Sequence, residues 1–182
     1  IWPGGKRRLL PEIRVRYPWG LGGTIKKYAE PFVGGGAVLF DLLDIYKFES
    51  IYIGDANEDV ILSYLAIRDN LEELIELLDG YRSDYVKLDD AGQRVYYNGV
   101  VSSYNKAKKQ ADRSLVRVSL FLFLVYSCFN GIYRVNRKGE FNQSRGYLKA
   151  WDINRFRLIS KAIVHGDYKL VDFFVDSETF VY

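Results

Sequence analysis

The stretch Glu30-Pro-Phe-Val-Gly-Gly-Gly-Ala-Val-Leu-Phe40 decides how this chain folds. Three consecutive glycines, Gly34, Gly35 and Gly36, precede an apolar run, which predicts a strand end, a tight turn and the start of a helix. Glycines let a backbone come close to a ligand because they carry no Cβ. A strand, a glycine turn and a helix in this order begin an open α/β sheet, whose ligands bind at the carboxyl ends of the strands.

The composition is that of a globular protein. The chain has 182 residues, of which 48% are hydrophobic and 27% charged, which is enough for one sizeable core and argues against disorder. Its net charge of +3 permits nucleic-acid binding without establishing it. Cys128 is the only cysteine, which excludes an internal disulfide, and we expect no metal. The longest apolar run, Leu120 to Tyr126, is too short to span a bilayer and is typical of a core, so we expect no membrane contact. The single cysteine is compatible with a reducing interior, and we expect a cytoplasmic localisation.

Apolar periodicity predicts alternating strands and helices in the first 80 residues. The expected helices cover residues 6–15, 37–43, 57–67 and 71–78, with Asn57 as an N-cap, and the expected strands cover 27–33 and 50–54. From Tyr81 to Lys149 the pattern changes to helices at 96–110 and 112–126 and an aromatic, basic segment at 129–145. We interpret this part as a helical lobe inserted in the sheet domain. Strand-like runs return at 162–165, 169–174 and 179–182.

Asp55 follows the second expected strand, about 20 positions after the glycines, which is the spacing of a carboxylate that binds ribose hydroxyls. The glycines do not supply the GxGxxG spacing, no GxxxxGK[ST] run is present, and Glu30 would repel a polyphosphate. A nucleoside with a positive charge suits this loop, and S-adenosylmethionine has a sulfonium, an amino group and a ribose. The alternative is a turn that only connects a strand to a helix.

Two shorter motifs add candidate ligand contacts. Trp2-Pro-Gly-Gly-Lys6 is either a plain turn before a helix or a place where Lys6 pairs with a ligand carboxylate and the glycines allow close approach. Near the other end, Asp167 could accept a hydrogen bond from an adenine amino group, and Tyr168 could cover the base. We interpret His165 as a strand-end residue without a catalytic partner.

The segment from Phe129 to Asn142 has the composition that DNA recognition needs. Arg134 can form a bidentate pair with guanine. The other candidates are Asn130 and Asn142 for base edges, Ile132 for a wedge between bases, and Arg137 and Lys138 for phosphates. The alternative is a solvated basic loop with aromatic residues packed beneath it.

Six motifs, in this order, resemble the Dam-type (D12 class, alpha-group) DNA adenine-N6 methyltransferases over nearly the whole chain. They are Trp2-Pro-Gly-Gly-Lys6, Glu30-Pro-Phe-Val-Gly-Gly-Gly36, Asp55-Ala-Asn57, Phe129-Asn-Gly-Ile-Tyr-Arg134, Gly139-Glu-Phe-Asn142 and Gly166-Asp-Tyr168. Each motif alone is weak, whereas six in sequence are hard to obtain by chance. The resemblance implies an α/β fold: a Rossmann-like S-adenosylmethionine-dependent methyltransferase sheet, incomplete here, with an inserted helical target-recognition domain.

The resemblance also implies three parts and a set of contacts. Residues 1–80 would bind the cofactor, residues 81–149 would form the helical DNA target-recognition domain, and residues 150–182 would return to the sheet. S-adenosylmethionine would contact Trp2, Gly5, Lys6, Glu30, Phe32, Gly34, Gly35, Asp55, Asp167 and Tyr168. Its methionine end would meet Trp2 and Lys6, its ribose Asp55, and its adenine Asp167 and Tyr168. Double-stranded DNA would contact Asn130, Ile132, Arg134, Arg137 and Asn142.

Two departures from the family pattern matter. After Phe141-Asn142 the family usually continues Val-Pro-[Phe/Tyr]-Gly, whereas this chain has Gln143-Ser-Arg-Gly146, so no recognition sequence is inferred. The catalytic Asp-Pro-Pro-Tyr motif is absent, because the only prolines stand at positions 3, 11, 18 and 31. The resemblance places the run that ends at Tyr182, residues 179–182, as the strand that leads to this motif. We therefore expect no catalytic residue up to Tyr182, and a chain that is inactive alone.

Three hypotheses remain open from the sequence. The first is the N-terminal portion of a site-specific enzyme that transfers a methyl group from S-adenosylmethionine to adenine in duplex DNA, in DNA methylation or restriction–modification. The second is one subunit of a split methyltransferase whose partner chain supplies the catalytic motif. The third is a DNA-binding module that keeps the fold without turnover.

Overall fold

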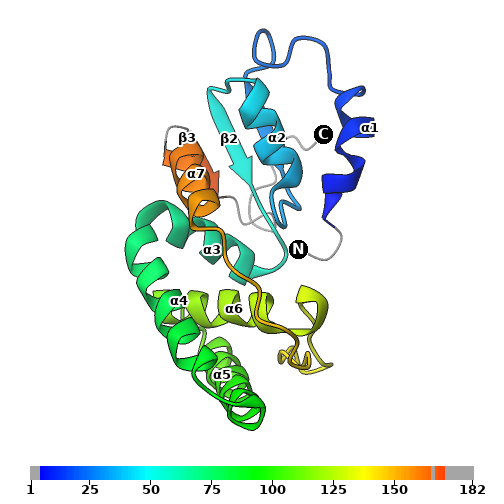
Figure 1. Ribbon diagram of the computed structural model, residues 1–182. Helices are drawn as coiled ribbons and strands as arrows, with labels where there is room; N and C mark the ends of the chain where they lie inside the picture. Colours follow the sequence, from blue (N-terminus) through cyan, green and yellow to red (C-terminus); the bar gives the residue numbers. More distant parts are fainter. Residues whose placement is uncertain (1–4, 165–166, 171–182) are drawn as a thin grey trace. The chain divides into compact units, whose positions relative to one another are not determined.

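The computed structural model describes residues 5–164 and 167–170 (Figure 1). They form two compact units. One unit, here the sheet unit, comprises residues 5–61 and the described residues after 157, and the other, the helical unit, comprises residues 62–157. The three parts expected from the resemblance, with limits at residues 80 and 149, stay a prediction.

A three-stranded parallel sheet forms the centre of the sheet unit. Its strands are β1 (Lys27–Glu30), β2 (Ser50–Ile53) and β3 (Asp167–Leu170), in the order β1-β2-β3. Helix α2 (Ala37–Ile45) connects β1 to β2, as a parallel pair requires. The predicted first and second strands are therefore confirmed, although β1 ends three residues before Val33.

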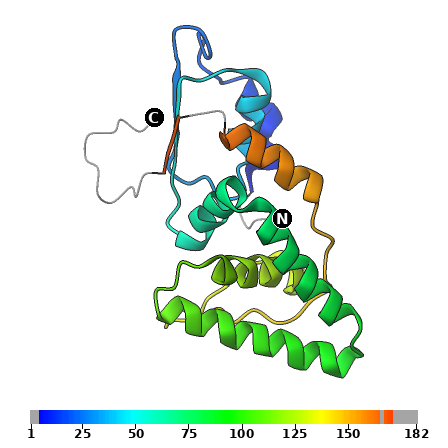
Figure 2. The same cartoon turned by 90° about the vertical axis from the view of Figure 1, so that its left-hand side faces the viewer.

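The core of this unit lies between the sheet and α2. Ile51 and Ile53 alternate along β2 and are almost fully buried, and Leu39 and Leu42 of α2 are buried as well. The predicted N-terminal helix is observed as a short 3-10 turn, η1 (Lys6–Leu9), followed by α1 (Leu10–Arg14). Figure 2 shows α1 and α2 on the same side of the sheet.

A buried carboxylate joins the N-terminal helix to α2. Asp41 accepts hydrogen bonds from Arg14 Nε at 2.9 and 3.0 Å and from the Tyr17 hydroxyl at 2.8 Å. The hydrogen bonds from Arg14 hold the pKa of Asp41 below its ordinary value, so this carboxylate is ionised at neutral pH. Because Lys6 begins the same helical segment, the bridge also fixes where Lys6 lies in the sheet unit.

The helical unit contains most of the long helices that the structure describes. They are α3 (Glu58–Asp69), which begins in the sheet unit, α4 (Leu71–Val86), α5 (Asp90–Lys109) and α6 (Leu115–Ser127), and α6 packs against both α4 and α5. The predicted cap of α3 is confirmed, since Asn57 Oδ1 accepts from the Asp59 N–H at 3.1 Å. Within the described ranges, no helix is long and apolar enough to cross a membrane.

The prediction of a strand at residues 162–165 is wrong for residues 162–164. They end helix α7 (Ile153–Val164). Apolar residues recur at helical spacing from Ile153 through Phe156 and Ile159 to Ile163, and this periodicity outweighs the short β-branched run that suggested a strand.

The last predicted strands are only partly covered by the structure. Lys169 and Leu170 belong to β3, whereas residues 171–174 lie outside the described residues, as does His165. The run at 179–182 that was expected to lead to the catalytic motif lies outside them too, and so does its last residue, Tyr182. The expected strand at Tyr182 therefore stays a prediction.

Replacement of Gly146 and of Gly80 by alanine should change the stability in opposite directions. A Cβ at Gly146 would lie 2.8 Å from the carbonyl oxygen of Cys128 and 2.8 Å from the Cα of Phe129, and backbone atoms move less readily than a side chain. We therefore expect Gly146→Ala to lower the free energy of unfolding by about 1–3 kcal/mol. A Cβ at Gly80, inside α4, meets nothing within 4 Å, so Gly80→Ala should raise it by roughly 0.5–1 kcal/mol.

Urea unfolding of the two variants beside the wild type measures both effects. A Gly146→Ala protein as stable as the wild type would contradict the close approach of residue 146 to the end of α6. A destabilised Gly80→Ala protein would contradict the open surface of α4.

Candidate functional site

The carboxyl ends of β1 and β2 hold the expected loop residues together. Glu30 pairs with Ile53 at the last register position of the two strands. The loops that follow are joined by backbone hydrogen bonds, from Gly54 N–H to the Glu30 carbonyl and from Val33 N–H to the Gly54 carbonyl, both at 2.9 Å. Gly34 and Gly36 have φ of 48° and 68°, a conformation that favours glycine. The glycine turn predicted between strand and helix is present.

Asp55 holds this glycine loop from the neighbouring strand end. Its Oδ2 accepts from the Gly34 N–H and its Oδ1 accepts from the Asn57 N–H, each at 2.8 Å. The carboxylate thus ties the turn after β1 to the start of α3. Because each carboxylate oxygen can accept more than one hydrogen bond, Asp55 retains capacity to accept from hydroxyl groups of a ligand.

Glu30 is a buried carboxylate, with 7% of its surface exposed. The Tyr28 hydroxyl donates to its Oε2 at 2.8 Å, and Lys6 Nζ donates to its Oε1 at 3.4 Å and to the Phe32 carbonyl at 3.2 Å. Burial raises the pKa of Glu30 above its ordinary value, while the hydrogen bonds from Tyr28 and Lys6 oppose that change. Burial and the nearby Glu30 charge also raise the pKa of Tyr28, which therefore stays a neutral donor.

Tyr28 was not among the residues expected from the sequence. The signal that could have found it is the period of two along a strand, which places residues 28 and 30 on the same side of β1. A hydroxyl two positions before a buried carboxylate on one strand face is well placed to bond it. The structure therefore adds Tyr28 to the site as a partner of Glu30.

The remaining expected cofactor residues are placed differently. Gly5 is exposed before η1, Gly35 is exposed in the loop, and Phe32 is 70% exposed. Asp167 and Tyr168 begin β3, where they pair with Ser50 and Ile51 at the amino end of the strands. The structure does not bring these two positions to the edge that holds Glu30 and Asp55. Trp2 lies outside the described residues.

In the segment predicted to meet DNA, the 3-10 turn η2 (Phe129–Gly131) is followed by a short β-hairpin at residues 134–142. Val135 and Phe141 form an antiparallel bridge, Asn136 N–H donates to the Glu140 carbonyl at 2.8 Å, and Asn142 N–H donates to the Arg134 carbonyl at 3.1 Å. Asn136 Oδ1 accepts from two backbone N–H groups at the tip, where Gly139 has φ of 77°. The tip also carries the exposed cations Arg137 and Lys138.

Arg134 and Asn142 form an exposed pair across this hairpin. Arg134 Nε donates to Asn142 Oδ1 at 3.0 Å, and Arg134 Nη2 donates to the Asn142 carbonyl at 2.8 Å. A guanidinium has five N–H donors, so the pair still offers donors to base edges. Ile132 is 40% exposed, and Asn130 is exposed with a φ of 56°.

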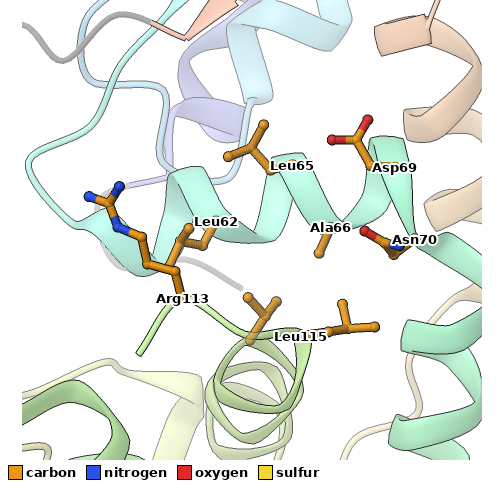
Figure 3. A pocket seen from close by; sticks show the side chains of 8 residues that line it. Leu62, Leu65, Ala66, Asp69, Asn70, Arg113 and Leu115 are labelled. Atoms are coloured by element: carbon orange, nitrogen blue, oxygen red, sulfur yellow. The ribbon is translucent and has the colours of Figure 1, made fainter. Parts of the chain in front are cut away.

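The helical unit also contains a small cavity of about 120 Å³. It lies between α3, from Leu62 to Asp69, and the residues from Arg113 to Val118, which lead into the start of α6, with Asn70 at one end (Figure 3). None of the eight residues that line it is a site residue expected from the sequence. We assign no role to this cavity.

Comparison with known proteins gives one consistent result. The family model of the D12 class N6 adenine-specific DNA methyltransferases matches residues 2–182. A type II methyltransferase of Methanocaldococcus jannaschii is 43% identical over all of this chain and 65% of its own length. DNA adenine methylases of Haemophilus influenzae and Escherichia coli are 34% and 30% identical over 81% of this chain. The chain spans 46% and 47% of their lengths, so it covers only part of each relative.

Because Glu30 is buried, we expect its replacement by a neutral residue to stabilise the protein, by an amount that depends on pH. Because the pKa of Glu30 is raised in the folded protein, the folded state loses stability relative to the unfolded chain as pH rises from the ordinary glutamate range through that pKa. Glu30→Gln removes this loss and retains an oxygen for the Tyr28 hydroxyl. We expect the melting temperature of the variant minus that of the wild type to be larger at pH 8 than at pH 4.

Glu49→Gln is a matched control, because Glu49 is 61% exposed and pairs with Lys26 at the surface. Thermal unfolding followed by circular dichroism at both pH values gives the comparison. A Glu30→Gln difference that is the same at pH 8 and pH 4 would show that the Glu30 charge carries no penalty.

Proposed function

This chain belongs to the D12 class of N6 adenine-specific DNA methyltransferases, and we propose that it holds the cofactor-binding and target-reading parts of an enzyme that methylates adenine in duplex DNA from S-adenosylmethionine. The observation that carries the proposal is the polar edge at the ends of β1 and β2. Lys6, Glu30, the glycine loop and Asp55 are linked there by hydrogen bonds.

The groups at this edge fit S-adenosylmethionine. The cofactor has two cationic groups, a carboxylate and a ribose diol, and it supplies an electrophilic methyl group when bound. Glu30 offers a buried negative charge, Asp55 offers carboxylate oxygens, and Lys6 offers an ammonium group that already lies beside the loop. The glycines allow a ligand to approach the loop backbone because no Cβ intervenes.

Each residue of the edge has a proposed task. Lys6 binds the carboxylate of the methionine part, while Glu30 stabilises the positive charge that lies next to it. Asp55 accepts from the ribose hydroxyls, and its bonds to Gly34 and Asn57 orient the carboxylate for this contact. The roles expected for Trp2, Gly5, Phe32, Gly34, Gly35, Asp167 and Tyr168 are retained as predictions.

The hairpin is the proposed reader of the DNA target. The exposed Arg134 guanidinium is the proposed guanine contact, and the tip cations Arg137 and Lys138 are proposed to bind phosphates. Ile132 is proposed to insert between bases and fill the space that the extruded adenine leaves. This contact would offset part of the few kcal/mol that moving an adenine out of the duplex costs. Asn130 and Asn142 are proposed to contact base edges.

The chemistry in such an enzyme is mainly positioning. Methyl transfer needs the donor and the adenine nitrogen in line, and a fixed geometry contributes much of the rate. The residues up to Tyr182 contain no Asp-Pro-Pro-Tyr motif, so we assign none of them to bonding with the target amine. The residues assigned above bind and orient.

Isothermal titration calorimetry of the full-length protein with S-adenosylhomocysteine, the demethylated product, tests the cofactor site. We expect saturable binding that Asp55→Asn weakens by roughly ten- to a hundredfold, because a charged acceptor of the ribose is replaced by an amide. Asp44→Asn is the control, since Asp44 is an exposed carboxylate on α2 outside the site. Absence of saturable binding in the wild type would overturn the proposed function.

Two arginines of the hairpin should affect DNA binding in different ways. Arg134→Ala should lower the ratio of affinities for the target site and for a site with one base changed. We expect a decrease of about tenfold or more, because a base contact is lost. Arg137→Ala should weaken binding to all duplexes and reduce the slope of log affinity against log salt by about one. Fluorescence anisotropy across a salt series separates the two, and a reversal of these effects would contradict the assignments.

A further inference from the structure

We propose that Asn105 is a positioning residue for target reading, because its side-chain amide fixes the hairpin strand that holds Arg134. The inference rests on the proposed function, in which the hairpin reads DNA. Asn105 lies on α5, and its Oδ1 accepts from the Phe141 N–H at 2.8 Å. Its Nδ2 donates to the Phe141 carbonyl at 3.0 Å. One side chain thus satisfies both backbone groups of a hairpin residue.

The two backbone groups of Phe141 have no partner in the opposite strand of the described hairpin. The hairpin bonds are made by the residues on either side, from Asn142 N–H to the Arg134 carbonyl and from Asn136 N–H to the Glu140 carbonyl. Phe141 therefore presents an edge-strand N–H and C=O, which need a partner when partly buried. The carboxamide of Asn105 supplies one acceptor and one donor, as a neighbouring peptide would, and sets the register of this strand on α5.

The fixed strand determines where the reading side chain lies. Asn142 follows Phe141 directly, and its side-chain oxygen and carbonyl oxygen accept the two hydrogen bonds from Arg134. A shift of Phe141 along α5 would move both acceptors together. Arg134 is exposed and has a long, flexible side chain, so these bonds restrict its conformations before DNA binds. Such preorganisation favours the correct base contact, because Arg134 loses less conformational entropy when it binds.

Other contacts hold the hairpin against α5 when the amide is changed. The Phe141 ring is 2% exposed, with its centroid 6.1 Å from that of Tyr104 on α5. Lys108 Nζ donates to the Tyr133 hydroxyl at 2.8 Å, and the Tyr97 hydroxyl donates to the Gln143 carbonyl at 2.9 Å. These contacts keep the hairpin docked, so the contribution specific to Asn105 is alignment.

The test uses the full-length protein and a pool of random-sequence duplexes. Sequencing of the bound fraction gives the ratio of affinities for the preferred site and for sites with one base changed. Asn105→Asp keeps the acceptor for the Phe141 N–H but places a second oxygen against the Phe141 carbonyl. We expect this variant to lose about tenfold in the ratio, and Asn105→Ala, which removes both groups without adding charge, to lose as much.

Two comparisons separate positioning from general destabilisation. Val118→Ala removes buried packing on α6 and should leave the ratio unchanged despite a lower melting temperature. In an Arg134→Ala background, Asn105→Asp should cause a much smaller loss than in the wild-type background, because Asn105 acts mainly through Arg134 and only in part through Asn142.

The outcomes distinguish this inference from the function on which it rests. A wild-type ratio in both Asn105 variants, or an additive loss in the Arg134→Ala background, would overturn the role of Asn105. A wild-type protein without any sequence preference would overturn target reading by the hairpin. A preference without methylation of the selected duplexes would overturn only the proposed reaction.

Discussion

The parallel pairing of β1 with β2 is the constraint on which the sheet unit depends. Parallel strands end at the same edge, so residues separated by a whole helix, Glu30 and Asp55, come next to one loop. Backbone bonds between the two strand ends and the Asp55 carboxylate then hold the glycines in a conformation that other residues adopt less readily. A shift in this register would separate Asp55 from the glycine loop, whose Gly34 N–H donates to its carboxylate.

The charges at this edge are balanced in a way that suits a cationic ligand. Glu30 is buried, and the Lys6 side chain that faces it is 43% exposed, so solvent weakens their attraction. Lys6 neutralises the buried carboxylate only in part, so a further positive charge beside it would stabilise its ionised form. The same burial disfavours the ionised form when no ligand is present. The buried charge of Glu30 therefore lowers the stability of the sheet unit, and the proposed binding of a cationic cofactor would offset this loss.

Local patterns predicted much of this structure, and long-range contacts explain what they missed. The first two strands, the presence of the helices up to α6 and the Asn57 cap follow from periodicity and from capping chemistry over a few neighbouring residues. The bounds differ, since α4 continues to Val86 instead of residue 78 and α5 begins at Asp90 instead of residue 96. The position of Asp167 depends on pairing with Ser50, more than a hundred residues earlier, and the strand predicted at 162–164 is a helix. Nothing in the local sequence distinguishes Asn105 from other polar residues on a helix. Its role depends on the contact with Phe141, which lies 36 positions later in the chain.

The hairpin contacts divide into two groups with different sequence requirements. Attachment to α5 uses the backbone and buried ring of Phe141, whereas the exposed surface uses the side chains of Arg134 and of the tip from Asn136 to Glu140. A backbone contact imposes little on the identity of neighbouring residues. The tip can therefore exchange its exposed side chains without loss of its attachment to α5. If the hairpin reads DNA as proposed, a few such substitutions would be enough to change the target sequence.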